Sequence, residues 1–407
     1  MSSQPPSSQD TPISQDTPST TPSSFTPSPP SAKFIAEPFY FDEKNTGEQI
    51  DSFVLNGEKY RRFEKLGEGA FGAVYKVVSE NRRVFAGKLI KVQEDDDEHS
   101  GYSRVKNEIK IFDLLRSVEH ANVLQSKKYG MMEHSIDGFH KHILIFPLLG
   151  PSLSETLDDA MVDDHKYKKD RNSTAAPAMA FKTSIVREFA QQIAKGMAFL
   201  QKYHVLHLDL KLDNLCFANV EPDISYLFHK RSISFITMKH SAIKIVDFGQ
   251  AQISHHPKAN KLFHATTYRC PELLLGLPYS EVSDVWPFGV LMIEMYCGER
   301  LFQSDAKEKR ICEAWTFRNI QSVMGEKVTK ELWMEARLEA SPELRGSVRN
   351  DSVPGDATLP LFTELKRNEE ADLLFKCAKR ALTINWHDRP TFQQLLQDPY
   401  LSGTTDE

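Results

Sequence analysis

Six polar residues of this chain have the chemistry needed to handle a phosphate ester and a divalent cation: Lys88, Glu108, Asp209, Lys211, Asn214 and Asp247. A lysine amine can neutralise phosphate oxygens as a point charge. Carboxylate and amide oxygens are ligands that Mg²⁺ accepts. Any one of these residues alone would more often be an ordinary surface charge. The prediction therefore depends on the motifs in which they stand.

The most specific motif is H-L-D-L-K-L-D-N-L at residues 207–215. It matches H-R-D-x-K-x-x-N except at Leu208. We predict that Asp209 orients a substrate hydroxyl and accepts its proton, and that Lys211 neutralises the γ-phosphate of a nucleotide. Asn214 is predicted to bind Mg²⁺ through its amide oxygen.

A second motif, D-F-G at residues 247–249, follows a β-prone run. Its aspartate, Asp247, is predicted to bridge a metal ion to the β- and γ-phosphates. Lys88 ends the sequence V-F-A-G-K, which matches V-A-x-K with one residue displaced. We expect Lys88 to approach the α- and β-phosphates, and Glu108, in the next predicted helix, to pair with it and hold its amine in place.

A glycine-rich segment precedes this lysine. Taken alone, G-x-G-x-x-G is a weak signal, because dinucleotide-binding turns share it. In those turns the glycines open a helix, whereas here the β-prone residues 74–78 follow, so the turn joins two strands. Glycine lets a backbone lie close over phosphates without a side-chain clash. The residues expected to cover a nucleotide are Leu66, Gly67, Glu68, Gly69, Ala70, Phe71, Gly72, Ala73 and Val74.

Three residues near the other end of the chain are predicted to support this geometry. Glu272 belongs to Y-R-C-P-E at residues 268–272, Asp284 to D-V-W, and Arg389 to W-H-D-R-P-T. We expect Glu272 and Arg389 to form a buried ion pair, and Asp284 to brace the backbone around Asp209.

The elements that must position these residues form two blocks. Residues 60–147 contain β-rich runs interrupted by one helix at about 103–117. After Leu149 the pattern turns helical, with an apolar stripe at Ile185, Phe189, Ile193, Met197 and Leu200. Residues 282–296 are apolar on nearly every face, which predicts a buried helix. Residues 159–180 and 346–360 read as surface insertions. The fold class is therefore α+β, a β-rich lobe followed by a larger helical lobe.

Composition sets the domain boundaries. The chain has 407 residues, 40% of them hydrophobic, and a net charge of -6, which gives no strong indication of nucleic acid or membrane binding. Residues 1–32 are mostly Ser, Thr, Pro, Gln and Asp, which predicts a disordered tail. We place an extension at 33–59, the domain at 60–400 (lobes 60–147 and 150–400) and a short tail at 401–407. No secretory signal is recognisable. The five dispersed cysteines fit a reducing, intracellular compartment rather than a disulfide framework.

In their order and spacing these motifs resemble the eukaryotic protein kinase superfamily across about residues 60–400. The Y-R-x-P-E stretch, L-L-G at 274–276 and the length of region 301–365 resemble the CMGC group. Within it the chain looks most like the LAMMER or CDC-like kinases, because of F-P-L-L-G at 146–150, the long segment 217–242 and the two histidines His255 and His256.

The resemblance implies a bilobal protein kinase fold that binds ATP and Mg²⁺. It implies adenine contacts from Ala86, Phe146, Leu149 and Leu215, with Pro147 keeping a backbone carbonyl for the base. It also implies transfer of phosphate to serine or threonine, with tyrosine open, in protein substrates that include basic, Arg/Ser-rich ones. It implies a nuclear location as well, with the cytoplasm as the alternative. We expect a monomer without direct nucleic-acid or membrane partners.

Three departures from the family pattern are present. The E-H-L-A-M-M-E-R motif is not retained at residues 317–325. Leu208 replaces the arginine that usually neutralises a phosphorylated activation loop, although CDC-like kinases often lack it too. Ala265 stands where a threonine usually braces the catalytic Asp and Lys, unless Thr266 or Thr267 substitutes for it.

Two other readings are open. A pseudokinase scaffold would bind nucleotide or partners without turnover, and Leu208 and Ala265 favour it. A small-molecule kinase of related fold would share the small lobe and a catalytic aspartate. Such enzymes generally lack the P-E and W-x-x-R-P elements, which are present here at 271–272 and 386–390.

Overall fold

The computed structural model describes residues 49–69, 72–90, 101–133, 142–254, 264–302, 309–326, 328–336 and 368–403, without the side chains of 101–105 and 309–315. The chain divides into two compact units, Met1–Phe34 and Ile35–Glu407, and every described residue belongs to the second. The predicted tail at 1–32 and the predicted insertion at 346–360 lie outside the described residues.

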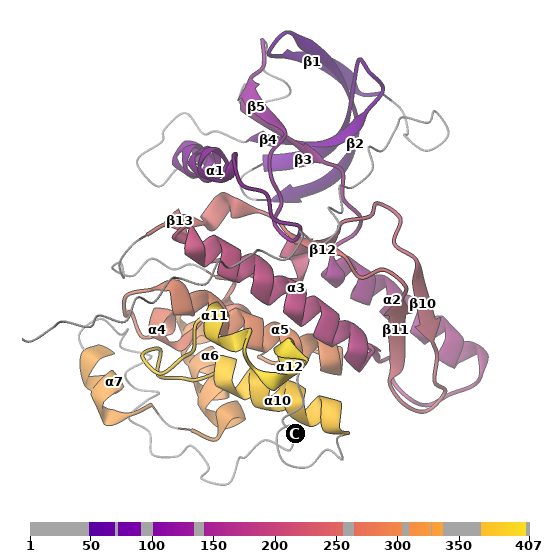
Figure 1. Cartoon of the computed structure of the whole chain (residues 1–407). Helices are drawn as coiled ribbons and strands as arrows, with labels where there is room; N and C mark the ends of the chain where they lie inside the picture. Colours follow the sequence, from indigo (N-terminus) through magenta and orange to yellow (C-terminus); the bar gives the residue numbers. More distant parts are fainter. Residues whose placement is uncertain are drawn as a thin grey trace, which may run out of the picture. The chain divides into compact units, whose positions relative to one another are not determined.

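The first block of the second unit is an antiparallel sheet in the order β1-β2-β3-β4-β6-β5 (Figure 1). Strand β1 lies within the segment predicted as an extension. After the helix at 101–115, the next strand of the sheet begins at Lys128. The strands are β1 (Asp51–Leu55), β2 (Glu58–Gly69), β3 (Gly72–Ser79), β4 (Val84–Ile90), β5 (Lys128–Met131) and β6 (His142–Pro147).

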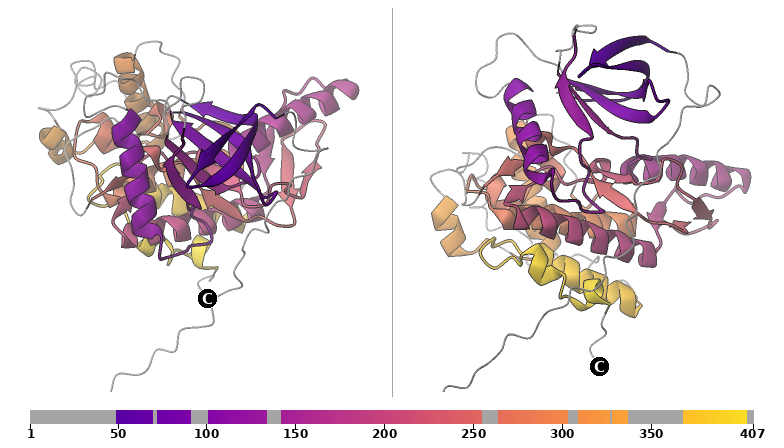
Figure 2. Two further views of the ribbon diagram at one scale, coloured as in Figure 1. Left: turned by 90° about the horizontal axis from the view of Figure 1, so that it is seen from above. Right: turned by 45° about the horizontal axis from the view of Figure 1, so that its top comes forward.

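The register of this sheet determines which residues lie beside Lys88 and Ala86. Lys88 on β4 pairs with Val74 on β3 and with Leu144 on β6, and Ala86 pairs with Phe146. Because side chains alternate between the faces of a strand, Ala86 and Lys88 point to the same side. The helix α1 (Gly101–Leu115) lies beside this sheet in both views of Figure 2 and carries Glu108.

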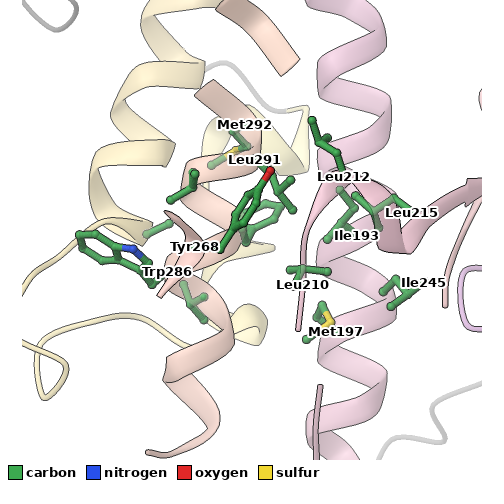
Figure 3. Close-up of a cluster of buried hydrophobic side chains, with 14 of the residues drawn as sticks. Ile193, Met197, Leu210, Leu212, Leu215, Ile245, Tyr268, Trp286, Leu291 and Met292 are labelled. Carbon is green, nitrogen blue, oxygen red and sulfur yellow. The ribbon is translucent and has the colours of Figure 1, made fainter. Parts of the chain in front are cut away.

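The second block is mainly helical. All five residues of the predicted stripe on α3 (Thr183–Lys202) are buried. The central helix α5 (Val285–Cys297) is buried over its first eleven residues, as its unbroken apolar sequence predicted. Figure 3 shows Ile193 and Met197 of α3 and Leu291 and Met292 of α5 in one apolar cluster. Further helices of the described residues in this block are α4 (Pro271–Leu274), α6 (Lys309–Met324), α7 (Lys330–Ala336), α10 (Glu369–Ala381), α11 (Phe392–Leu395) and α12 (Pro399–Ser402).

Helix α12 includes the first residues of the segment predicted as a C-terminal tail. Leu401 is buried in the core there. Asp398 caps the helix by accepting a hydrogen bond from the Tyr400 amide. None of the described helices is both long and apolar enough to cross a lipid bilayer.

The predicted surface insertion at 159–180 is mostly exposed or half-buried, but it includes a regular helix that the composition did not indicate. Most of its residues belong to α2 (Leu153–Asp170), which begins with a capping box between Ser152 and Glu155. The ion pair between Lys168 and Asp164 is buried, and Asp164 also accepts a hydrogen bond from Ser234 on β11 (Ser234–Met238). This bond fastens the second half of the helix to β11.

The long segment 217–242 forms a hairpin. Its strands β10 (Ile224–Leu227) and β11 (Ser234–Met238) form a sheet with β7 (Met179–Phe181). Four short strands also lie in the described part of the helical lobe: β8 (Val205–Leu206), β9 (Leu215–Phe217), β12 (Ile243–Ile245) and β13 (Gln252–Ile253). It also contains the 3₁₀ turns η1 (Leu212–Asn214), η2 (Phe248–Gln250), η3 (Thr266–Tyr268) and η4 (Glu281–Asp284). The pair β9–β12 brings the two predicted metal ligands, Asn214 and Asp247, to neighbouring strand ends.

Candidate active site

A cleft of about 920 Å³ contains most of the predicted nucleotide-binding residues. Such a volume is within the usual range for small-molecule sites. Residues of the sheet, of α1, of the chain between β6 and α2, of the turn before β9, of β9 itself and of the segment after β12 all contribute to it. The predicted residues that line it are Leu66, Gly67, Glu68, Gly69, Gly72, Val74, Ala86, Lys88, Glu108, Phe146, Leu149, Asn214 and Asp247.

The glycine-rich turn offers backbone free of side chains. A Cβ atom on Gly67 or Gly69 would meet no atom within 4 Å, whereas one on Gly72 would lie 2.1 Å from the Leu89 carbonyl oxygen. Gly72 is thus required by the close approach of β4, while the other two glycines leave open space at the cleft. Ala73 is buried and does not line the cleft, because it points to the opposite face of β3. Ala70 and Phe71 lie outside the described residues.

Lys88 is the charged centre of the cleft. Its Nζ atom donates to both carboxylate oxygens of Glu108, at 3.0 Å each, and to Asp247 Oδ1 at 3.0 Å. The lysine and the glutamate are largely buried, whereas the Asp247 side chain is 45% exposed. The ion pair between Lys88 and Glu108 was predicted from the sequence, whereas the contact between Lys88 and Asp247 was not.

Electrostatics in this triad favour the charged forms of Lys88 and Asp247. Burial lowers the pKa of Lys88, but the charges of Asp247 and Glu108 outweigh it, so its pKa lies above the ordinary value. The positive charge of Lys88 lowers the pKa of Asp247 to about 2, against the opposing effect of burial. Burial raises the pKa of Glu108, and the charge of Lys88 opposes this. The amine is therefore held as a cation between two acidic side chains.

Asp209 stands at the centre of a second cluster. Its carboxylate Oδ2 lies 3.2 Å from Lys211 Nζ and accepts a hydrogen bond from the Asn214 amide at 3.2 Å. The same amide donates to the Asp209 carbonyl oxygen at 2.7 Å. Asp209 and Lys211 do not line the cleft, but Asn214 does, so Asn214 connects this cluster to it.

The backbone before Asp209 has an unusual conformation that Asp284 stabilises. Leu208 has a φ of 60°, in the left-handed region that side chains other than those of Gly, Asn and Asp rarely adopt. The Asp284 carboxylate accepts hydrogen bonds from the His207 and Leu208 amides at 2.7 and 2.8 Å. The predicted role of Asp284 as a brace is confirmed by these bonds.

Asp247 is also left-handed, with a φ of 62°, and its side chain accepts a hydrogen bond from the Gly249 amide. This conformation turns its carboxylate toward Lys88 rather than along the strand. The described residues contain no cluster of three His, Cys, Asp or Glu side chains that could hold a metal by itself. The amide of Asn214 and the carboxylate of Asp247 offer few oxygen ligands. This suits Mg²⁺, because Mg²⁺ at such sites also takes ligands from the phosphates of a nucleotide.

The adenine side of the cleft requires one correction. Leu215 is fully buried, does not line the cleft and lies in the apolar cluster of Figure 3. The next residue, Cys216, lines the cleft instead, because adjacent strand residues face opposite sides. Burial raises the pKa of its thiol to about 12, so it is a neutral apolar contact. Phe146, Pro147 and Leu149 line the cleft as predicted.

Two further groups fasten the segment after Asp247. Arg389 makes a two-pronged pair with Glu272, with both contacts at 2.8 Å and both side chains fully buried, as predicted. Tyr268 donates a hydrogen bond to the buried Glu294 at 2.5 Å. Within the described residues no hydrogen bond joins the hydroxyl of Thr266 or Thr267 to Asp209 or Lys211, so neither replaces the missing threonine at position 265.

Comparison with known proteins agrees with this geometry. The protein kinase domain family matches residues 60–401, which is most of the chain. The chain belongs to the protein kinase family. A crystal structure of a kinase domain superposes with a TM-score of 0.66 at 20% identity, covering 88% of this chain and 100% of that one, and supports the fold.

The relatives include dual specificity and serine/threonine-protein kinases at modest identity. The dual specificity protein kinase CLK2 of Homo sapiens is 29% identical over 61% of this chain and 45% of its own length. The human dual specificity protein kinase CLK4 is 28% identical over 84% of this chain and 66% of its own length. The serine/threonine-protein kinase AFC1 of Arabidopsis thaliana is 28% identical over 60% of this chain and 49% of its own length. The chain thus spans about half to two thirds of the length of these relatives.

Proposed function

We propose that the chain is an ATP-dependent protein kinase of the CDC-like type, which transfers the γ-phosphate of Mg·ATP to serine or threonine, and also to tyrosine, in protein substrates. One observation carries the proposal. Lys88 contacts both Glu108 and Asp247 in a cleft that Asn214 links to Asp209. These residues come from distant parts of the sequence, and the fold brings them to one site.

Bound Mg·ATP would supply the transferable phosphoryl group and the metal charge that neutralises its oxygens. Gly67 and Gly69 leave room for phosphates at the roof, and Lys88 would bind phosphate oxygens. Asn214 and Asp247 would hold the metal. Asp209 would orient the substrate hydroxyl and accept its proton, while Lys211, already beside it, would stabilise negative charge.

A scaffold without turnover is the alternative. Leu208 favours it, because this position cannot bind a loop phosphate when its side chain is fully buried and apolar. The intact contacts of Lys88, Asp209 and Asn214 favour catalysis instead, since an arrangement kept only for partner binding would not need them. We therefore propose an active enzyme in which position 208 does not bind a phosphorylated activation loop.

Exposed acidic side chains of the cleft support a basic protein substrate. They are Glu155, Asp158, Asp159 and Asp213, which all line the cleft. This charge fits arginine-containing peptides such as those that the resemblance implies. Glu294 is buried and bonded to Tyr268, so it is not available at the surface for such a contact.

The experiment compares Lys88→Met and Asp209→Asn in two assays: phosphate transfer from radiolabelled ATP to a degenerate peptide array, and thermal stabilisation by Mg·ATP. We expect each variant to lose transfer by about 10³-fold or more. Because Asp209 does not line the cleft, Asp209→Asn should keep the nucleotide-induced shift in Tm, whereas Lys88→Met should lose it.

Matched controls are Lys239→Met and Asp223→Asn, which remove an exposed ion pair on the hairpin side of the lobe. Both controls should behave like the wild type in the two assays. A wild-type chain that is stabilised by Mg·ATP but transfers no phosphate would establish the scaffold reading. Full transfer by Asp209→Asn would disprove the assigned role of that carboxylate.

A further inference from the structure

His264 lies after the stretch 255–263, just before the turn η3, and contacts the catalytic loop. Its backbone amide donates a hydrogen bond to the Leu208 carbonyl oxygen at 3.0 Å. Its own carbonyl oxygen accepts a bond from Arg269 Nη2 at 3.1 Å. His264 has a φ of 61°, so two left-handed residues, His264 and Leu208, face each other across one hydrogen bond.

The imidazole ring is buried without a hydrogen-bond partner. Its side chain is 1% exposed, and neither ring nitrogen has a hydrogen-bond partner among the described residues. A buried polar group without a partner is costly, and native structures contain few of them. An apolar residue of the same size would avoid this cost. The presence of a histidine here therefore calls for a reason other than packing.

The carboxylate of Asp284 lies close to this ring. The Nε2 atom of His264 lies 3.6 Å from Asp284 Oδ1, and both side chains are buried. That same oxygen accepts the Leu208 amide, and Oδ2 accepts the His207 amide. A slight approach of the ring would complete a charge-assisted hydrogen bond to the carboxylate that holds the backbone preceding Asp209.

We propose that His264 is a positioning residue of the catalytic loop, whose imidazole acts through Asp284 to hold Leu208 and thereby aim Asp209. This inference rests on the proposed kinase function. It explains how a loop with Leu208 in place of an arginine remains ordered: the activation segment is joined to the catalytic loop by a backbone bond and a buried histidine. No phosphate on the segment is needed for this contact.

Three variants separate the ring from the backbone. His264→Gly removes the ring but allows the positive φ and retains the amide that donates to Leu208. His264→Asn also tolerates this backbone conformation and keeps a side-chain donor. His204→Gly is the matched control, because His204 has a φ of 56° but its side chain is exposed.

We expect His264→Gly to lower kcat by about 10- to 100-fold, with the KM for ATP and the nucleotide-induced shift in Tm unchanged. His264→Asn should recover part of the loss, and His204→Gly should match the wild type. In a double-mutant cycle with Asp284→Asn, the two losses should not multiply, because both changes remove the same contact. Equal kcat in His264→Gly and the wild type, or fully multiplicative losses, would overturn the proposal.

Amide hydrogen exchange tests the same contact without turnover. The amides of His207 and Leu208 should exchange faster in His264→Gly, while those of the buried helix α5 should not change. If the wild type transfers no phosphate, the proposed function fails, and the exchange result still decides whether His264 holds the loop. Unchanged protection of both amides would show that it does not.

Discussion

At the scale of single residues, Glu294 is a carboxyl group that the fold keeps out of water. It is 2% exposed and is bonded to the Tyr268 hydroxyl and the Leu301 amide. Burial raises its pKa to about 7 from the ordinary 4.5, and the two hydrogen bonds only partly oppose this effect. The folded protein therefore retains a proton on Glu294 over a range of pH in which the unfolded chain has lost it.

This difference predicts the pH dependence of stability. Between pH 4.5 and about 7 the folded state binds more protons, so the free energy of unfolding falls as pH rises. The contribution is complete below pH 4.5 and is lost above 7, and it amounts to about 3 kcal/mol. Glu294→Gln stays neutral, so urea unfolding across this range should show a flatter dependence and a more stable variant at high pH.

The exposed Glu281 supplies the control for this prediction, because Glu281→Gln changes the same group outside the core. It should keep the slope of the wild type. Identical slopes in Glu294→Gln and the wild type would show that Glu294 is not the group responsible.

Prediction of single residues from the sequence succeeded where a motif specifies a polar residue at a fixed position. Lys88, Glu108, Asp209, Asn214 and Asp247 were placed by their spacing, and the structure brings them to one region. The prediction was wrong where neighbouring apolar residues compete for one position, as with Leu215. Strand parity decides which neighbour faces the cleft, and a strand of three residues is too short to reveal its parity in sequence.

At the scale of elements, the ion pair between Glu272 and Arg389 connects the start of α4 to the turn before α11. Arg389 also donates to the carbonyl oxygens of Thr383 and Val282, and Ser283 donates to Glu272. Both side chains of the pair therefore have hydrogen-bond partners besides each other. Removing one ion leaves the other buried and unpaired, which is more costly than removing both.

Arg389→Met should therefore reduce the free energy of unfolding by about 3–5 kcal/mol. Urea unfolding measures this loss. The control is Arg380→Met, whose ion pair with Asp398 involves an arginine that is 49% exposed, and the expected loss is about 1 kcal/mol. Similar losses in both variants would mean that burial of the Glu272–Arg389 pair has no special weight.

Helix α2 shows why some elements were missed. Residues 159–180 are rich in charge, and composition therefore suggested a surface insertion. The start of the helix was nevertheless readable as S-x-x-E at Ser152 and Glu155, which is the capping-box pattern. The buried pair of Asp164 and Lys168 could not be predicted, because its partners Ser234 and Ala178 come from elements distant in sequence.

At the scale of the whole kinase domain, a row of rings connects the two lobes behind the cleft. Phe112 on α1 lies 5.4 Å from the ring of Phe146 and 5.6 Å from that of Phe248, both edge to face. Phe248 in turn lies 5.3 Å from the ring of His207. The helix that carries Glu108 is thereby in contact with the residue beside Asp247 and with the catalytic loop. Nucleotide binding should depend on this row as much as on the polar groups.

Phe112→Ala tests this connection. The variant should lose about 3–5 kcal/mol of stability, as buried phenylalanines do, and should also lose the stabilisation by Mg·ATP, because Glu108 and Asp247 are no longer held at Lys88. Phe288→Ala is the matched control, since Phe288 is fully buried and packs edge to face on Phe392 within the helical lobe. It should lose similar stability yet keep the nucleotide-induced shift in Tm. If both variants retain that shift, the polar triad holds its geometry without Phe112, and the lobes are coupled through the backbone between β6 and α2 instead.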